Sequence, residues 1–202
     1  MAAIKRITNE MNRKFPKNII DLSTSYNLSF LSNNDLTTNI KLSVDIYNNY
    51  SSSFKQLLII DLSNTYPFTS PYPLVNTKYG FKNYNRWCAD VTSIINNRYF
   101  LSSTNILIAS FFSIDINTTL YKNFKNTPIK FPIQCLCCES ITCSNKWNPG
   151  CQIKLIIEEY LFNKKFLFFT SPLGSKLIMS IFYNEKWNIP EDILLYIFQF
   201  II

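Results

Sequence analysis

The stretch Ile40-Lys41-Leu42-Ser43-Val44-Asp45-Ile46 alternates apolar and polar residues, which is the pattern of an antiparallel strand with one buried face. Polar and aromatic residues from 48 to 53 turn the chain, and the more apolar run Phe54–Leu62 follows. Two strand-like segments joined by a short turn predict a hairpin. We expect this hairpin to form the centre of an antiparallel sheet.

Segments on either side extend the hairpin. Tyr26–Leu31 is a candidate strand before it, and Leu74–Tyr79 is a candidate fourth strand after it. Between the hairpin and that fourth strand, Asn64–Pro73 carries three prolines, which exclude helix and central strand, so we expect it to run extended over a surface. Ala3–Phe15 places apolar residues at helical spacing and ends before Pro16. The sequence predicts an α/β (α+β) fold: a four-stranded antiparallel meander sheet flanked by helices.

The second half of the chain is less regular. Residues 80–131 are expected to be a large insertion of uncertain structure, in which Trp87–Ile95 is helix-like and Tyr99–Ile116 is strand-like. A core helix is expected from Cys151 onward, because apolar residues recur there at helical spacing. Its exposed side is expected to carry three charged residues: Lys154, Glu158 and Glu159. We predict one domain in three segments, 1–79, 80–131 and 132–202.

The C-terminal segment Pro190–Ile202 is predicted to be a helix, since proline and two acids suit its first turn. Its broad apolar face is expected to pack on the same domain rather than on a partner.

Composition indicates a folded protein that is neither membrane-spanning nor nucleic-acid-binding. Hydrophobic residues make up 47% and charged residues 16% of the 202, and the net charge of +7 is spread along the chain. The longest apolar runs, Ile106–Ile114 and Ile193–Ile202, are shorter than the ~18 residues of a spanning helix. The N-terminus lacks an apolar signal core. We expect a cytoplasmic protein with reduced thiols, so clustered cysteines favour a metal, a nucleophile or packing over a disulfide.

Five of the six cysteines lie in the segment Cys135–Cys151, which also contains Trp147-Asn148-Pro149 and leads into the apolar helix. We expect any chemistry to be located there. The sixth, Cys88, is isolated and expected in the core.

The order of these features resembles the ubiquitin-conjugating enzyme family over Ala3–Tyr79 and Pro132–Leu161. The features that carry the resemblance are the first helix ending at Phe15-Pro16, the meander, Tyr66-Pro67-Phe68 followed by Pro71, a cysteine, and Trp147-Asn148-Pro149 before a helix. Cys138 stands nine residues before Trp147, which matches the family's catalytic cysteine.

The resemblance implies a transferase of the ubiquitin conjugation pathway that needs no cofactor. Cys138, with Cys137 as the alternative, would accept ubiquitin from the activating enzyme as a thioester, assisted by the nearby positive charges of Lys130 and Lys146. A RING-type ligase would bind two loops. The residues implied in that contact are Tyr66, Pro67, Phe68, Trp147, Asn148 and Pro149.

Departures from the family pattern support a second interpretation. The chain has no histidine, so the family's His-Pro-Asn motif is missing, and the equivalent stretch Thr127–Pro132 has no asparagine to stabilise an oxyanion. The connection between the fourth predicted strand and the cysteines is also longer than the corresponding connection in the family. The alternative is a catalytically inactive interaction or structural protein on the same fold. The chain is rich in cysteine and in the residue types that AT-rich genes encode. This composition resembles that of proteins of large DNA viruses of amoebae, which would place the chain in host cytoplasm or in the virion.

Two further interpretations of the cysteines stay open. Cys135-x2-Cys138 is a knuckle-like pair that Cys143 and Cys151 can complete as a four-cysteine zinc site in a binding module. The thiols can instead be buried as small hydrophobic groups.

Overall fold

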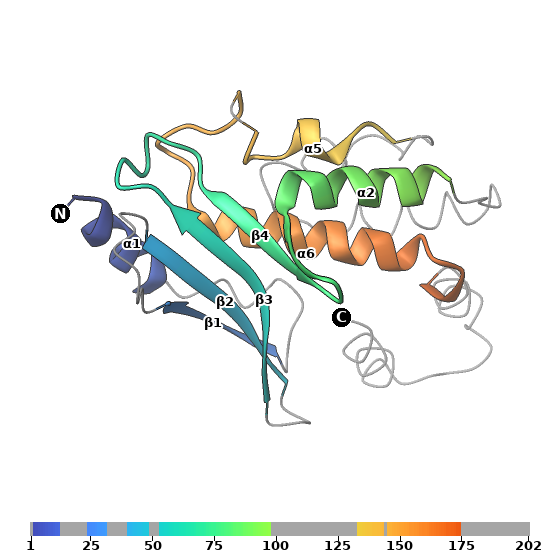
Figure 1. The fold of residues 1–202 in the computed structure, drawn as a ribbon, viewed down its shortest axis with the longest axis horizontal. Coiled ribbons are helices and arrows are strands. Elements are labelled where there is room, and N and C mark those ends of the chain that lie inside the picture. Colours follow the sequence, from blue (N-terminus) through green and yellow to red (C-terminus); the bar gives the residue numbers. More distant parts are fainter. Residues whose placement is uncertain are drawn as a thin grey trace, which may run out of the picture. The chain divides into compact units, whose positions relative to one another are not determined.

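The structure is a computed structural model, and it describes residues 2–12, 24–31, 40–48, 53–97, 133–143 and 145–174 (Figure 1). The elements in chain order are α1 (Ala2–Asn12), β1 (Thr24–Phe30), β2 (Ile40–Asn48), β3 (Ser53–Leu62), β4 (Tyr72–Thr77), β5 (Gly80–Asn83), α2 (Tyr84–Asn96), α5 (Leu136–Glu139) and α6 (Ile153–Phe169). Within these ranges, no helix combines the length and the apolarity needed to cross a bilayer. The predicted segments Tyr99–Ile116 and Pro190–Ile202 lie outside the described residues.

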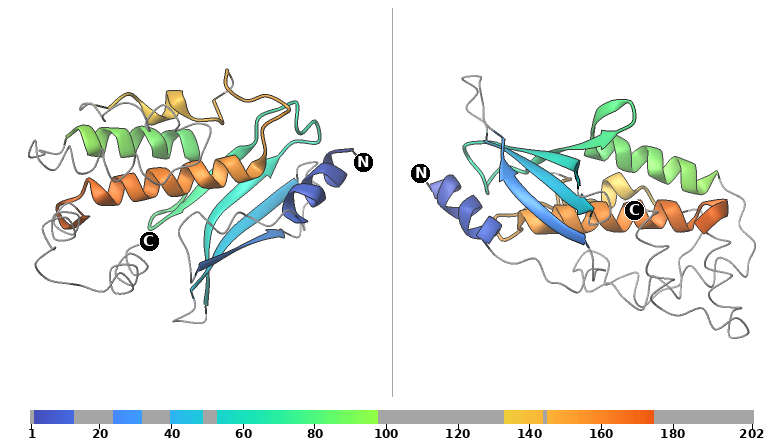
Figure 2. Two further views of the ribbon diagram at one scale, coloured as in Figure 1. Left: turned by 180° about the vertical axis from the view of Figure 1, so that it is seen from behind. Right: turned by 90° about the horizontal axis from the view of Figure 1, so that it is seen from below.

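The described part of the chain is α+β, with one antiparallel sheet in the order β1-β2-β3-β4-β5. The predicted pairing of the two central strands is confirmed, because β2 and β3 pair antiparallel from Ile40↔Leu62 to Asn48↔Ser53. Their long twisted ribbon is visible in both views of Figure 2. The alternation of β2 buries Leu42 and Val44 completely, as a half-buried strand requires.

A bulge interrupts the β2–β3 ladder. Val44 pairs with Leu58 and Asp45 with Gln56, which leaves Leu57 as the extra residue, and both leucines are buried. Ser43 is also buried, against the simple alternation of its strand. Its Oγ accepts a hydrogen bond of 2.7 Å from Gln56 Nε2 and donates one of 2.8 Å to Asp45 Oδ1, which satisfies this polar group.

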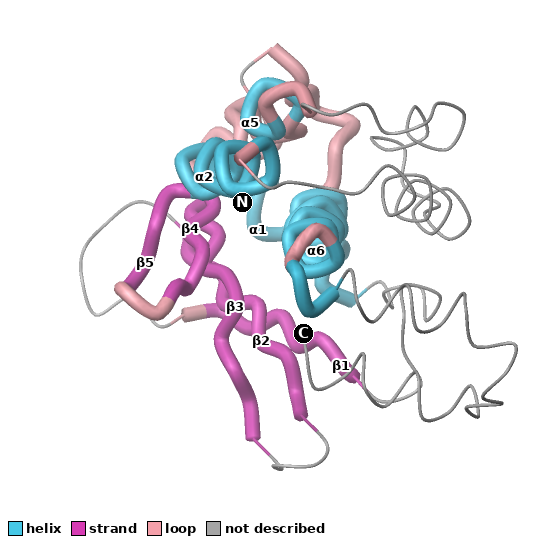
Figure 3. Tube along the Cα trace, turned by 90° about the vertical axis from the view of Figure 1, so that its right-hand side faces the viewer, coloured by secondary structure: helices cyan, strands magenta, loops and turns pink. Residues whose placement is uncertain are grey.

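The sheet has a fifth strand that the sequence prediction did not include. β4 and β5 form a hairpin closed by Lys78 and Tyr79, with Thr77 paired to Gly80. Gly80 has a φ of 103°, a backbone conformation that disfavours any residue with a Cβ, so this glycine permits the tight return of the chain. β5 runs directly into α2 (Figure 3), and α2 confirms the helix expected at Trp87–Ile95.

The chain divides into two compact units. The first comprises Met1–Cys88 and Cys137–Glu158, and the second comprises Ala89–Leu136 and Glu159–Ile202, so the division passes through α2, α5 and α6. Fully buried residues of the first unit include Ile7, Leu58, Ile60, Tyr84 and Ile156. Those of the second unit that are almost fully buried include Val91, Ile95 and Phe166.

Helix α6 confirms the core helix predicted after Cys151, but its expected charged face is wrong. Glu158 and Glu159 are 7% and 1% exposed, and every other residue from Ile156 to Asn163 is buried as well. A helix buried all round has no solvent side for acids to occupy. Glu158 is 3.8 Å from Lys154 Nζ, which partly compensates its charge. Burial nevertheless raises the pKa of the Glu158 carboxyl above its ordinary value of 4.5, with Lys154 opposing the rise.

Glu158→Gln should therefore raise the melting temperature (Tm) at pH 7. A raised pKa in the folded chain means that ionisation of Glu158 destabilises the folded state, and this loss is absent below the ordinary pKa of 4.5, where the carboxyl is protonated in both states. The advantage of the glutamine variant in Tm should therefore shrink as the pH falls from 7 towards 4.5. Tm measured as a function of pH tests this. Glu139→Gln, on an exposed side chain, is the control and should show little difference. A constant advantage of Glu158→Gln at every pH would contradict the assigned cause.

Candidate functional site

Glu10 of α1 joins three segments of the first unit. Its carboxylate accepts hydrogen bonds from Tyr66 Oη at 2.9 and 3.0 Å, from Arg6 Nε at 2.8 Å, and from the backbone N–H of Ile153 at 2.9 Å. Arg6 also donates from Nη2 to the carbonyl of Cys151 at 2.8 Å. The first helix, the Tyr66 loop and the start of α6 are thus connected by one carboxylate.

The electrostatics of this cluster keep Tyr66 protonated. Burial, and then the charge and hydrogen bond of Glu10, raise the pKa of Tyr66 well above its ordinary value of 10.0, against the smaller opposing effect of Arg6. Tyr66 is 2% exposed and remains a hydrogen-bond donor at neutral pH. Sequence reasoning missed this role of Glu10. The available signal was the i,i+4 spacing of Arg6 and Glu10, which pairs the two on one helix face.

The Trp147 loop is held directly on the Tyr66 loop. Trp147 Nε1 donates to the carbonyl of Pro67 at 2.8 Å, and the indole lies 6.0 Å from the Tyr66 ring, centroid to centroid. Asn148 shapes the next turn, since its Oδ1 accepts from the N–H of Gly150 at 2.9 Å and its carbonyl accepts from the N–H of Cys151 at 2.9 Å. The two motifs are 80 residues apart in sequence and in contact in space.

The six residues predicted to contact a partner separate into two groups. Tyr66 is buried, and Pro67 and Trp147 are partly buried, so these three anchor the loops. Phe68 is 79% exposed, and Asn148 and Pro149 are exposed as well. A partner therefore has direct access to Phe68, Asn148 and Pro149.

The segment after the cysteines is tied to the same loops. Ser70 Oγ donates to the carbonyl of Thr142 at 3.1 Å, and Thr142 Oγ1 donates to Asn85 Oδ1 at 2.9 Å. Thr142 is also linked to Ser140, both through their hydroxyls at 2.8 Å and from its own N–H at 3.1 Å. These buried hydroxyls fix the backbone that follows Cys138.

The segment before the cysteines is held by α2 within the second unit. Asn96 brackets Ile133, donating from Nδ2 to its carbonyl at 3.0 Å and accepting at Oδ1 from its N–H at 2.7 Å. Thr92 Oγ1 accepts from the N–H of Leu136 at 3.0 Å. Both side chains lie in the segment predicted as an insertion, so no sequence pattern connects them with the cysteines.

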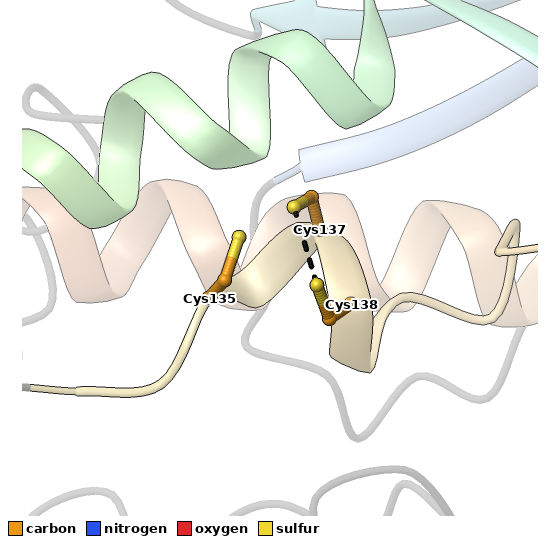
Figure 4. Close-up of side chains that lie close together, drawn as sticks. All are labelled: Cys135, Cys137 and Cys138. Carbon is orange, nitrogen blue, oxygen red and sulfur yellow. Dashed lines mark hydrogen bonds between the residues drawn. The ribbon is translucent and has the colours of Figure 1, made fainter.

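Three cysteines cluster at the start of α5 (Figure 4). The sulfurs of Cys135, Cys137 and Cys138 all lie within 4.8 Å of one another, and the Cys137 and Cys138 sulfurs are 3.8 Å apart. Cys135 and Cys137 are disulfide-bonded, and because the other four cysteines are free, the two are bonded to each other. Cys138 is a free, exposed thiol. The expectation that the cluster would not form a disulfide is wrong, since close sequence spacing brings the two sulfurs together.

The charges around Cys138 differ from those expected. Lys146 forms an ion pair with Glu139, the residue that follows Cys138, so its positive charge is already balanced by a carboxylate. Lys130, the other expected positive charge, lies outside the described residues. Of the two lysines that were expected to make the surroundings of the thiol positive, the structure therefore describes only Lys146, and that lysine is paired with a carboxylate.

The remaining cysteines lie apart from the cluster. Cys143 is partly exposed and Cys151 is buried at 8% exposure, just before α6, and the group of sulfurs within 4.8 Å includes neither. The set Cys135, Cys138, Cys143 and Cys151 of the zinc alternative is thus not gathered in this structure. Cys88 is fully buried, which confirms its expected place in the core.

Comparison with known proteins found no family model, no curated protein and no solved structure with a significant match to this chain.

Proposed function

We propose that this chain is a ubiquitin-conjugating-enzyme-like protein that accepts ubiquitin on Cys138. The observation that carries the proposal is the direct contact of the Trp147 loop with the Tyr66 loop, since these are the two motifs on which the resemblance rests. Exposure of the free Cys138 thiol supports its choice over Cys137, whose sulfur is in a disulfide. In this proposal the protein acts in the cytoplasm, where the activating enzyme supplies ubiquitin.

The proposed step is a transfer between two sulfurs. The thiolate of Cys138 attacks the thioester carbonyl carbon at the C-terminus of ubiquitin on the activating enzyme. A carbon–sulfur bond to Cys138 forms, the bond to the activating enzyme's cysteine breaks, and that cysteine leaves as a thiolate. Phe68, Asn148 and Pro149 are the exposed residues on which a RING-type ligase would dock. Phe68 is the expected anchor, because large aromatic side chains dominate binding energies.

A second candidate is an interaction protein of the same fold without transferase activity. The specific observation in its favour is the carboxylate of Glu139 beside Cys138, paired with the one described lysine that was expected to activate the thiol. The exposed Phe68, Asn148 and Pro149 would serve a partner equally well in this case.

Incubation with activating enzyme, ATP and ubiquitin should give an adduct on the wild-type chain that a reducing agent removes. Cys138→Ser should convert this thioester into an ester that resists reduction, because the serine oxygen replaces the sulfur. The measurement is the apparent mass of the chain on a denaturing gel, for the same sample run with and without reductant. Cys143→Ser is the matched control, since this free thiol is also partly accessible, and it should leave the adduct unchanged. Absence of an adduct with several activating enzymes would favour the interaction protein.

A further inference from the structure

We propose that Cys135, Cys137 and Cys138 form a thiol–disulfide exchange site, in which Cys138 opens the Cys135–Cys137 disulfide. The basis is local: one continuous turn of the chain presents a disulfide and a free thiol whose sulfurs lie within 4.8 Å (Figure 4). The inference concerns a different reaction from ubiquitin acceptance and does not depend on it.

The burial of these residues suits exchange. Cys138 is exposed, and Cys135 and Cys137 are both partly exposed. Nucleophile and disulfide are therefore both within reach of solvent, unlike Cys88 and Cys151, which are buried. Exchange requires such access in addition to the thiolate form of the attacking cysteine.

A purely structural role explains this disulfide poorly. A cross-link stabilises mainly by restricting the unfolded chain, and its effect grows with the length of the closed loop. Cys135 and Cys137 enclose a single residue, so the loop is about as short as a disulfide allows. Hydrogen bonds between side chains and backbone already hold this segment, from the N–H of Leu136 to Thr92 Oγ1 and from Ser70 Oγ to the carbonyl of Thr142.

The exchange step balances without an external oxidant or reductant. Cys138 loses its proton, and its thiolate attacks Cys135 Sγ, forming a Cys135–Cys138 bond while the Cys135–Cys137 bond breaks and Cys137 leaves as a thiolate that takes up the proton. The product is a Cys-x-x-Cys disulfide, the arrangement of redox-active pairs. Attack on Cys137 instead would link two adjacent residues in a much smaller ring. In the product Cys138 is no longer a free nucleophile.

Disulfide connectivity in the intact native chain tests the proposal. The protein is held in a glutathione redox buffer, free thiols are trapped with an alkylating agent, and the chain is digested in acid, which suppresses further exchange. The two possible bonds give peptides of equal mass, so fragment spectra are used to locate the alkylated cysteine. In the wild type they should show both Cys135–Cys137 with alkylated Cys138 and Cys135–Cys138 with alkylated Cys137. Cys138→Ser and Cys138→Ala should lose the second bond and keep the first, whereas Cys143→Ser should match the wild type.

Two results would overturn the proposal. One is a wild type that contains only the Cys135–Cys137 bond, with Cys138 alkylated throughout. The other is a folded wild type in which Cys135, Cys137 and Cys138 are all alkylated in the same buffer. Because the fragment spectra report sulfur connectivity and the gel reports ubiquitin, failure of exchange and failure of ubiquitin acceptance are separate outcomes.

Discussion

Glu10→Ala should lower the free energy of unfolding by about 3 kcal/mol, because it removes a nearly buried carboxylate that serves several donors. The variant leaves Tyr66 Oη and the N–H of Ile153 without their acceptor, and Arg6 without its ion-pair partner. Only 9% of the Glu10 side chain is exposed, so water replaces these bonds poorly. Urea unfolding, monitored by tryptophan fluorescence, measures the change.

Two further variants make this expectation specific. Glu10→Gln keeps the size and part of the hydrogen bonding but removes the charge, so its effect should be smaller than that of alanine. Glu139→Ala removes a carboxylate whose side chain is 48% exposed and should change stability by less than about 1 kcal/mol. If Glu10→Ala were no more destabilising than Glu139→Ala, Glu10 would not hold the three segments together.

Asn96→Ala should destabilise the second unit by about 2 kcal/mol, since it removes two hydrogen bonds and leaves a backbone N–H and carbonyl without their partners. Both belong to Ile133, which is 8% exposed. The amide of Ile133 should then exchange its hydrogen faster with solvent. Hydrogen exchange at that amide and urea unfolding are the two measurements.

Asn97→Ala is the matched control for Asn96. Asn97 is exposed, and its side-chain bond to Ser93 Oγ is 3.5 Å long, so its removal should cost less than about 0.5 kcal/mol. Unchanged exchange at Ile133 in Asn96→Ala would show that the bracket does not hold the chain ahead of the cysteines.

Features with a regular local pattern were predictable from the sequence. The alternation in 40–46 predicted β2 with its buried Leu42 and Val44, and helical spacing predicted α1, α2 and α6. The fifth strand was missed because only Gly80, a single residue, marks its turn. The burial of Glu158 was missed because periodicity places a residue on a helix face but does not say how many faces are covered.

The candidate site was predictable as a set of residue types, and less so as an arrangement. Sequence spacing selected Cys138 and the two loops, but it did not separate the anchoring Trp147 from the exposed Phe68. Glu10 and Asn96 escaped notice because their partners, Ile153 and Ile133, lie far along the chain and leave no local signal. The disulfide escaped notice because an assumed reducing environment outweighed the short spacing of its cysteines.

The Glu10 contact also has a consequence for the order in which the chain folds during synthesis. The hydrogen bond from Ile153 to Glu10 joins residues 143 positions apart, and the bond from Arg6 to Cys151 spans 145. The β2–β3 hairpin can form from neighbouring residues as it leaves the ribosome, whereas α1 must wait until the chain as far as Cys151 and Ile153 has been made. Until then, Arg6 and Glu10 of α1 lack these partners, so the helix reaches its final contacts only late in synthesis.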